Sequence, residues 1–162
     1  MLTETIYFAT SNAGKIISLQ RRLTPLNIAV EQMNIDMIEP QSDTCQEISE
    51  SKARQAYSVL KKPVLVDDSA FHIPALNGFP GPYVKYVLKT LGGRGILNTA
   101  SEISNRYAYF ESSLTFISNN DRYKTFSGKS TEGHLTKEFV QANNPAAWSE
   151  AWNIFVPRGS SK

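Results

Sequence analysis

The chain has 162 residues, of which 41% are hydrophobic and 20% charged, and its formal net charge is +2 at pH 7. This length suits one domain with a proper core, and so small a basic excess, without clustered lysines and arginines, argues against a stable nucleic-acid partner. The single cysteine, Cys45, excludes an intrachain disulfide framework, and no apolar run reaches membrane-spanning length. We therefore expect a cytoplasmic protein with a single domain over residues 1–162 and no membrane partner.

Up to residue 91, strand patterns alternate with amphipathic helix patterns. In chain order they are a strand at Thr5–Ala9, a helix from Ala13 that stops before Pro25, a strand at Ile28–Met33, a helix at Glu47–Leu60, a strand at Val64–Val66 and a helix at Tyr83–Leu91, closed by Gly92-Gly93. Such an alternation is typical of a sheet with helices packed around it.

The second half of the chain has mainly strand patterns. We expect antiparallel strands at Arg106–Ile117 and Arg122–Phe126 around a polar turn, and two further strands at Gly133–Thr136 and Trp152–Val156. Together with the preceding alternation, this order predicts an α/β fold with a mixed β-sheet.

Two adjacent carboxylates, Asp67 and Asp68, follow the predicted strand Val64–Val66, and Ser69 comes next. Acidic residues just past the carboxyl end of a strand lie where open α/β sheets place ligands. Because the two carboxylates repel each other, a folded protein tolerates them best beside a cation. A solvated Asp-Asp turn is the favoured interpretation of a bare pair, but the Gly/Pro-rich turn and the helix with Lys85 that follow favour a site.

The segment from Thr10 to Lys15, with the sequence TSNAGK, stands where a strand gives way to a helix. Free backbone N–H groups at a helix start favour an anion, Asn12 offers an amide donor, and Lys15 brings a point charge for phosphate. The spacing is not that of a Walker A loop. Taken alone, the segment favours a simpler interpretation, an asparagine cap followed by an exposed lysine.

The helix before the aspartate pair carries the charged segment QEISESKA. Glu47 and Glu50 are three residues apart and share a face, while Lys52 lies at a different angle. Taken alone, this segment favours an ordinary charged helix.

In order and spacing, these three segments together resemble the inosine triphosphate pyrophosphatase family. The resemblance lies in the T-x-N-x-x-K opening, the acidic helix segment that ends in Lys-Ala, the V-L-V-D-D-S run and the A-L-x-G-x-P-G-P-Y-V-K continuation, and it covers most of the chain. It implies an elongated mixed β-sheet flanked by helices, with two lobes around a central cleft, and a homodimer.

The resemblance also implies an activity: Mg²⁺-dependent hydrolysis of nucleoside triphosphates, above all deaminated purine ones such as inosine triphosphate, to a monophosphate and pyrophosphate. Carried over by position, it implies that Asp68 is catalytic and that Glu47, Asp67 and Asp68 hold the metal. The substrate-binding residues that it implies are Thr10, Asn12, Lys15, Lys52, Ser69, Lys85 and Trp152. The alternative is a nucleotide-binding protein of the same fold that has lost turnover or base selectivity.

The C-terminal segment departs from the family's pattern. The F-x-P-x-G end is present from Phe155 to Gly159, but Asn153 beside Trp152 stands nearest to the family's Asp-Pro, and the family's Ser-His-Arg base-reading segment is missing before Lys162. Trp148 and Trp152 fit equally a base-stacking role and a place in the core or an interface. We expect weaker discrimination among purine triphosphates than in the family.

Overall fold

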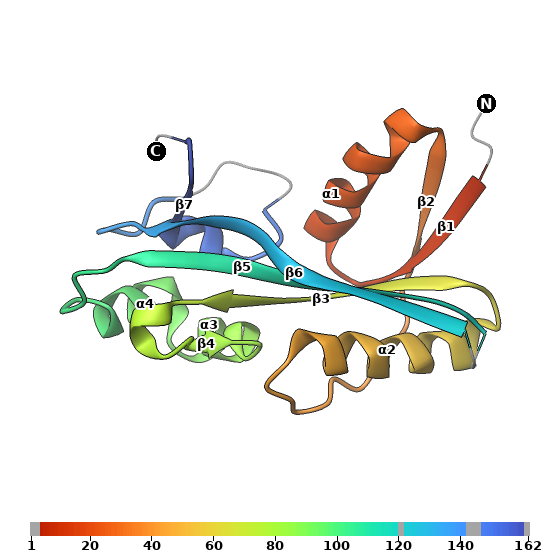
Figure 1. Cartoon of the computed structure of the whole chain (residues 1–162), viewed down its shortest axis with the longest axis horizontal. Helices are drawn as coiled ribbons and strands as arrows, with labels where there is room; N and C mark the ends of the chain where they lie inside the picture. Colours follow the sequence, from red (N-terminus) through yellow and green to blue (C-terminus); the bar gives the residue numbers. More distant parts are fainter. Residues whose placement is uncertain (1–3, 120–121, 142–146, 161–162) are drawn as a thin grey trace. The chain divides into compact units, whose positions relative to one another are not determined.

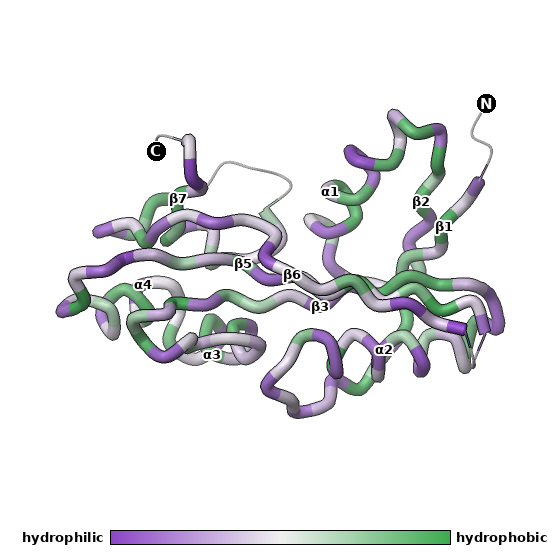
Figure 2. Tube along the Cα trace, in the orientation of Figure 1, coloured by the Kyte–Doolittle hydropathy of each residue, from purple (hydrophilic) through white to green (hydrophobic). Residues whose placement is uncertain are grey.

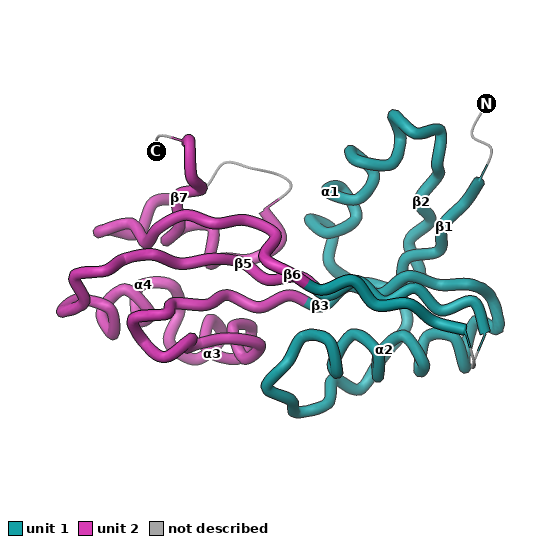
Figure 3. Tube along the Cα trace, viewed as in Figure 1, with its two compact units in different colours: residues 1–68, 113–127 teal, residues 69–112, 128–162 magenta. Residues whose placement is uncertain are grey.

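The computed structural model of the chain describes residues 4–119, 122–141 and 147–160 (Figure 1). Two compact units are present: unit 1 comprises Met1–Asp68 and Ser113–Ser127, and unit 2 comprises Ser69–Ser112 and Gly128–Lys162 (Figure 3). None of the helices in the described residues is both long and apolar enough to cross a membrane.

The strands form one mixed sheet in the order β2-β1-β3-β5-β6-β7, with β4 paired to β3. Strand β1 is parallel to β2 and β3, whereas β4 and β7 run antiparallel to β3 and β6. The strands are β1 Glu4–Ala9, β2 Ile28–Met33, β3 Val64–His72, β4 Pro80–Gly81, β5 Tyr107–Asn119, β6 Arg122–Leu135 and β7 Phe155–Pro157. The α-helices are α1 Ala13–Leu23, α2 Cys45–Leu60, α3 Val84–Thr90 and α4 Gly92–Thr99, and short 3₁₀ helices cover Thr24–Leu26, Pro74–Leu76 and Glu150–Ile154. The predicted α/β class, a mixed sheet with flanking helices, is confirmed.

In unit 1, α1 and α2 pack on opposite faces of β3 (Figure 1). Leu65 belongs to an apolar cluster with Ile16 of α1, whereas Val64 and Val66 belong to a cluster with Ala53 and other residues of α2. The two clusters follow from strand geometry, because successive side chains of a strand point to opposite faces. Hydrophobic and hydrophilic residues alternate along both helices (Figure 2), so each helix buries one face and exposes the other.

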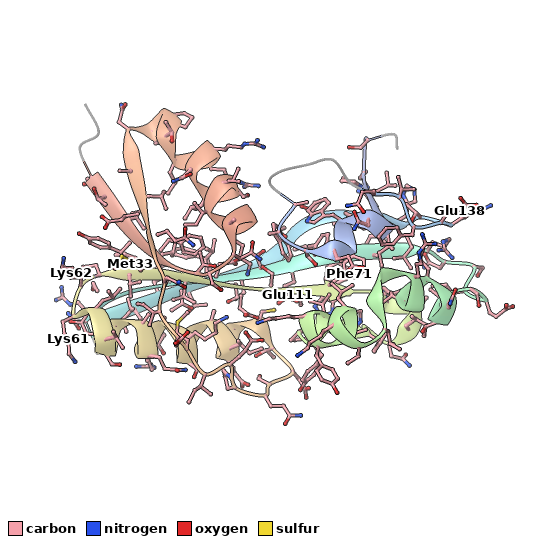
Figure 4. The ribbon with its side chains drawn as sticks, turned by 180° about the vertical axis from the view of Figure 1, so that it is seen from behind. Met33, Lys61, Lys62, Phe71, Glu111 and Glu138 are labelled. Atoms are coloured by element: carbon pink, nitrogen blue, oxygen red, sulfur yellow. The ribbon has the colours of Figure 1, made fainter. Side chains whose placement is uncertain are left out.

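Unit 2 has an aromatic core of its own. Phe71 of β3, labelled in Figure 4, lies 4.8 Å from Phe110 of β5 and 5.7 Å from Phe155 of β7, measured between ring centroids. Helices α3 and α4 cover this cluster with Val84, Val87, Ile96 and Leu97.

The predicted end of β3 at Val66 was wrong, because β3 continues to His72 and includes both aspartates. Aspartate is depleted in strands, which made a break at Asp67 the natural expectation. In the structure, β3 lies between β1 and β5, and its last residues pair with β4, so the strand has partners along its length. The two carboxylates lie beside the carboxyl end of the neighbouring strand β1. The pairing of β1 with β3 ends at Phe8 and Leu65, just before Asp67.

Three other boundaries differ from the expectation. Helix α3 ends at Thr90, and a second helix, α4, begins at Gly92, after a one-residue turn. Gly92 has a φ of 69°, and the side chain of Glu150 accepts a hydrogen bond from Gly93 N. The predicted strand at Gly133–Thr136 is the end of β6, and most of Trp152–Val156 forms a 3₁₀ helix before β7.

Candidate active site

Asp67 and Asp68 point to opposite faces of β3. Asp68 continues the series of Val64 and Val66 on the α2 face, and Asp67 continues that of Leu65 on the α1 face. Each carboxylate meets a lysine from the helix on its own side, Lys15 of α1 for Asp67 and Lys52 of α2 for Asp68. The adjacent negative charges are therefore neutralised separately, one on each face.

On the α1 face, Lys15 is held at two points. Its Nζ lies 2.8 Å from Asp67 Oδ2 and donates a second hydrogen bond to the backbone oxygen of Asp67, at 3.3 Å. The Lys15 and Asp67 side chains are only 14% and 12% exposed, so the alternative of an exposed lysine was wrong.

Asn12 places Lys15 at the start of α1. It is the N-cap, and its Oδ1 accepts a hydrogen bond from the backbone N of Lys15 at 3.2 Å. Thr10 Oγ1 in turn accepts a hydrogen bond from the backbone N of Asn12 at 3.1 Å. The TSNAGK segment thus forms a capped turn that aims Lys15 at the aspartate pair, and the cap interpretation of Asn12 is confirmed.

On the α2 face, Lys52 lies between two carboxylates. Its Nζ is 3.1 Å from Asp68 Oδ1 and 3.3 Å from Glu39 Oε2, and its side chain is 13% exposed. Glu39 comes from the segment between β2 and α2, where it is one of three acidic residues, and the sequence analysis did not single it out.

Burial and charge act in opposite directions on this group. Burial raises the pKa of the Asp68 carboxyl above its ordinary value, although Lys52 and Lys15 oppose the shift. Burial lowers the pKa of Lys52, but the carboxylates of Asp68 and Glu39 outweigh it, so the net shift is upward. The Lys52 side chain is therefore a firmly charged ammonium next to a carboxylate whose proton affinity exceeds that of an exposed aspartate.

Glu47 and Glu50, which precede Lys52 on α2 by five and two residues, have different surroundings. Glu50 Oε1 accepts hydrogen bonds from Thr125 Oγ1 and Gln46 Nε2, both at 3.0 Å, which ties it to β6. Glu47 is exposed in the first turn of α2, where its carboxylate accepts a hydrogen bond from Ser42. Of the two glutamates, Glu47 is the one more open to a ligand from solvent.

The donor set suits Mg²⁺, which prefers carboxylate oxygens and is bound in nucleotide enzymes through one or two carboxylates together with substrate phosphates and water. Asp68 lies on the α2 face of β3 and Asp67 on the α1 face, while Glu47 is an exposed carboxylate in the first turn of α2. Within the described ranges, no three His, Cys, Asp or Glu side chains are grouped so as to hold a metal alone. A three-carboxylate site of Glu47, Asp67 and Asp68 stays a prediction.

The other predicted substrate-binding residues belong to unit 2. Ser69 Oγ lies 3.4 Å from Ser112 Oγ, and Lys85 is exposed on α3. The Trp152 ring stacks on Phe110 with 4.7 Å between centroids and forms an edge contact with Phe155, so it packs against the core of this unit. Their roles toward a substrate stay predictions.

Comparison with known proteins gives a consistent result. The model of the Ham1 family matches residues 6–162. The chain is 37% identical to the dITP/XTP pyrophosphatase of Saccharolobus solfataricus, over 94% of the chain and 77% of that protein, and 33% identical to that of Hyperthermus butylicus, over 100% and 82%. Among solved structures, a HAM1 protein from Coxiella burnetii has a TM-score of 0.77 at 25% identity and covers 94% of the chain, with 81% of its own length matched. The chain therefore belongs to the Ham1 family, as its resemblance to inosine triphosphate pyrophosphatases predicted.

Proposed function

We propose that this chain hydrolyses nucleoside triphosphates to a nucleoside monophosphate and pyrophosphate. The observation that carries the proposal is the pair of adjacent, largely buried aspartates, each held by a lysine from a different helix, in a chain of the Ham1 family. A triphosphate needs its charge neutralised, and Lys15 and Lys52 are two cations placed at one pair of acidic residues.

In this proposal, Asp68 is the base. Its carboxylate removes a proton from a water molecule, the water oxygen bonds to the α phosphorus, and the bond between that phosphorus and the bridging oxygen breaks to release pyrophosphate. Burial suits Asp68 to this role, because a raised pKa makes a carboxylate a better proton acceptor. Asp67 faces α1 and serves as the partner that keeps Lys15 in place.

The lysines bind the phosphates. Both are already charged and ordered by carboxylates, so a phosphate oxygen replaces one of those contacts without ordering a free side chain. Asp68 and Glu47 would hold Mg²⁺ together with phosphate oxygens, and the ion would supply charge neutralisation at the phosphates.

The names of the relatives suggest the substrate class. Two proteins named dITP/XTP pyrophosphatase match the chain at 37% and 33% identity, which supports deaminated purine nucleoside triphosphates as substrates here. A cytoplasmic homodimer belongs to the same proposal, and light scattering coupled to gel filtration tests the dimer.

The decisive experiment measures product release with Mg²⁺ or with a chelator. Inosine, deoxyinosine, xanthosine, adenosine and guanosine triphosphates are supplied in parallel, and the products are separated by chromatography. Monophosphate and pyrophosphate in equal amounts support the proposal, whereas diphosphate and inorganic phosphate would place the cleavage at a different bond. Tight binding of a triphosphate with no product would instead indicate a binding protein that lacks turnover.

A further inference from the structure

The turn between β1 and α1, which leads to Lys15, is held by the neighbouring strand β2. Gln32 lies near the end of β2, and its Nε2 donates a hydrogen bond to the backbone oxygen of Thr10 at 2.8 Å. The backbone N of Thr10 donates one to the backbone oxygen of Met33 at 3.2 Å, and Met33 is labelled in Figure 4. Both hydrogen-bonding groups of the Thr10 backbone therefore contact β2, at the first residue after β1.

The Gln32 side chain makes its contact where the pairing of the two strands ends. The parallel register of β1 and β2 stops at Ala9 and Met33. Within such a ladder, the backbone carbonyls that face the neighbouring strand accept hydrogen bonds from its N–H groups, and at Thr10 a side-chain amide donates in place of an N–H. Thr10 is only 8% exposed, and a carbonyl of so buried a residue is costly to leave without a donor. The amide of Gln32 therefore helps to fix the position of Thr10.

From Thr10, a series of contacts leads to the Lys15 side chain. Thr10 Oγ1 accepts a hydrogen bond from the backbone N of Asn12, and Asn12 Oδ1 accepts one from the backbone N of Lys15. At the other end of its side chain, Lys15 Nζ lies 2.8 Å from Asp67 Oδ2. Because each of these contacts fixes the residue that makes the next one, the position of the Lys15 ammonium depends on a side chain of β2.

We infer that Gln32 is a positioning residue, which holds the turn from Thr10 to Asn12 so that Lys15 meets the phosphates of the substrate. The inference rests on the proposed function, and Gln32 acts through the turn rather than on the substrate. A neutral hydrogen bond from an exposed side chain adds little to folding stability, whereas a misplaced binding group can cost much more in affinity. The expected consequence of losing the Gln32 amide is therefore weaker binding of the triphosphate.

The test measures the Kd of a non-hydrolysable inosine triphosphate by calorimetry, and kcat and KM for pyrophosphate release. Gln32→Met removes the amide at nearly constant size, so the Kd should rise about fourfold and KM should follow it, while kcat should change by less than about twofold. Gln32→Glu keeps the size of the side chain, but its ionised carboxylate cannot donate, so its Kd should rise at least as much. The affinity for inosine monophosphate should stay near that of the parent chain, because the proposed contact of Lys15 is to an outer phosphate.

Two comparisons separate this role from a general effect on the fold. Gln20→Met is the matched control, because Gln20 Nε2 also donates to a backbone oxygen of β2, that of Val30 at 3.4 Å, but does not contact the turn, and this variant should bind like the parent. In a Lys15→Ala background, Gln32→Met should raise the Kd by less than about 1.5-fold further. An unchanged Kd in Gln32→Met, an equal rise in Gln20→Met, or the full rise in the absence of Lys15 would overturn the inference.

A second readout separates this inference from the proposed function. Acylation of the lysine amines, followed by mass spectrometry, reports how firmly Lys15 is held without any substrate or turnover. Gln32→Met should speed the labelling of Lys15 and leave unchanged that of Lys61, which lies at the end of α2 (Figure 4). A parent chain that releases no product would refute the proposed function, and unchanged labelling of Lys15 would refute the role of Gln32.

Discussion

The adjacent residues Asp67 and Asp68 have different partners on the two faces of β3. On the α1 face, the side chain and the backbone oxygen of Asp67 both bind Lys15. On the α2 face, Asp68 shares its lysine with Glu39. The exposed fractions of the two aspartates, 12% and 9%, are close, so burial alone does not distinguish them.

The two faces differ in the groups that hold the lysine side chain. The side chain and the backbone carbonyl of Asp67 both bind Lys15, so Asp67 and Lys15 are linked at two points. If Asp68 lost its charge, Lys52 would still have Glu39. On the α2 face the Lys52 ammonium is therefore shared by two carboxylates, one largely buried and one exposed.

The largest expected effect concerns the base. Asp68→Asn removes the charge at nearly constant volume, so pyrophosphate release should fall by roughly 10²–10⁴-fold, the range that general base catalysis supplies. Circular dichroism should show a folded chain, since Lys52 keeps Glu39 as a partner. A variant that turns over at the parent rate would show that Asp68 is neither the base nor an essential ligand.

The residues on the α1 face should affect the affinity for the triphosphate. Lys15→Ala removes a charge-assisted contact to phosphate, so we expect the Kd for a non-hydrolysable triphosphate to rise roughly tenfold or more, with little change for a monophosphate. Asp67→Asn should have a smaller effect in the same direction, and in the Lys15→Ala background it should add almost nothing. Equal losses for triphosphate and monophosphate in a titration by calorimetry would contradict a contact to the β or γ phosphate.

Removing Lys52 or Glu39 should shift the pH dependence of kcat/KM in opposite directions. A base works only when ionised, so kcat/KM should fall as the pH drops through the raised pKa of Asp68. The Lys52 charge lowers that pKa and the Glu39 charge raises it. Lys52→Met should therefore move the acid limb of the profile to higher pH, and Glu39→Gln should move it, by less, to lower pH. Shifts in the same direction would mean that the limb reports another group.

Much of unit 1 was predictable from the sequence because local patterns and tertiary structure agree there. The strand at Ile28–Met33 and the helix that starts at Ala13 have the predicted bounds, since Asn12 caps the helix and Pro25 follows its end. The role of Lys15 was misjudged when its segment was considered alone, because its partner Asp67 is 52 residues away in the sequence. Glu39 was missed for the same reason: its position depends on Gln55 of α2, and no local pattern marks such a contact.

The smallest expected effect concerns how α2 is held on the sheet. On the α1 face, Leu114 and Phe116 of β5 pack against an apolar cluster, whereas on the α2 face the buried hydroxyls of Ser113 and Thr115 lie 3.0 Å and 2.8 Å from Ser49 Oγ.

Ser49→Ala removes the shared partner, but Ser113 and Thr115 keep contacts to Ser127 and Thr125, at 2.7 Å and 3.0 Å. No buried hydroxyl is then left without a partner in this group, so the loss in unfolding free energy should be only about 1 kcal/mol, visible in urea as a lower midpoint at constant m-value. Turnover should stay near the parent value, because the apolar contacts of Ala53 and Ala56 still hold α2 against β3. A large drop in kcat would mean instead that the hydroxyl contacts between α2 and β5 set the position of Lys52.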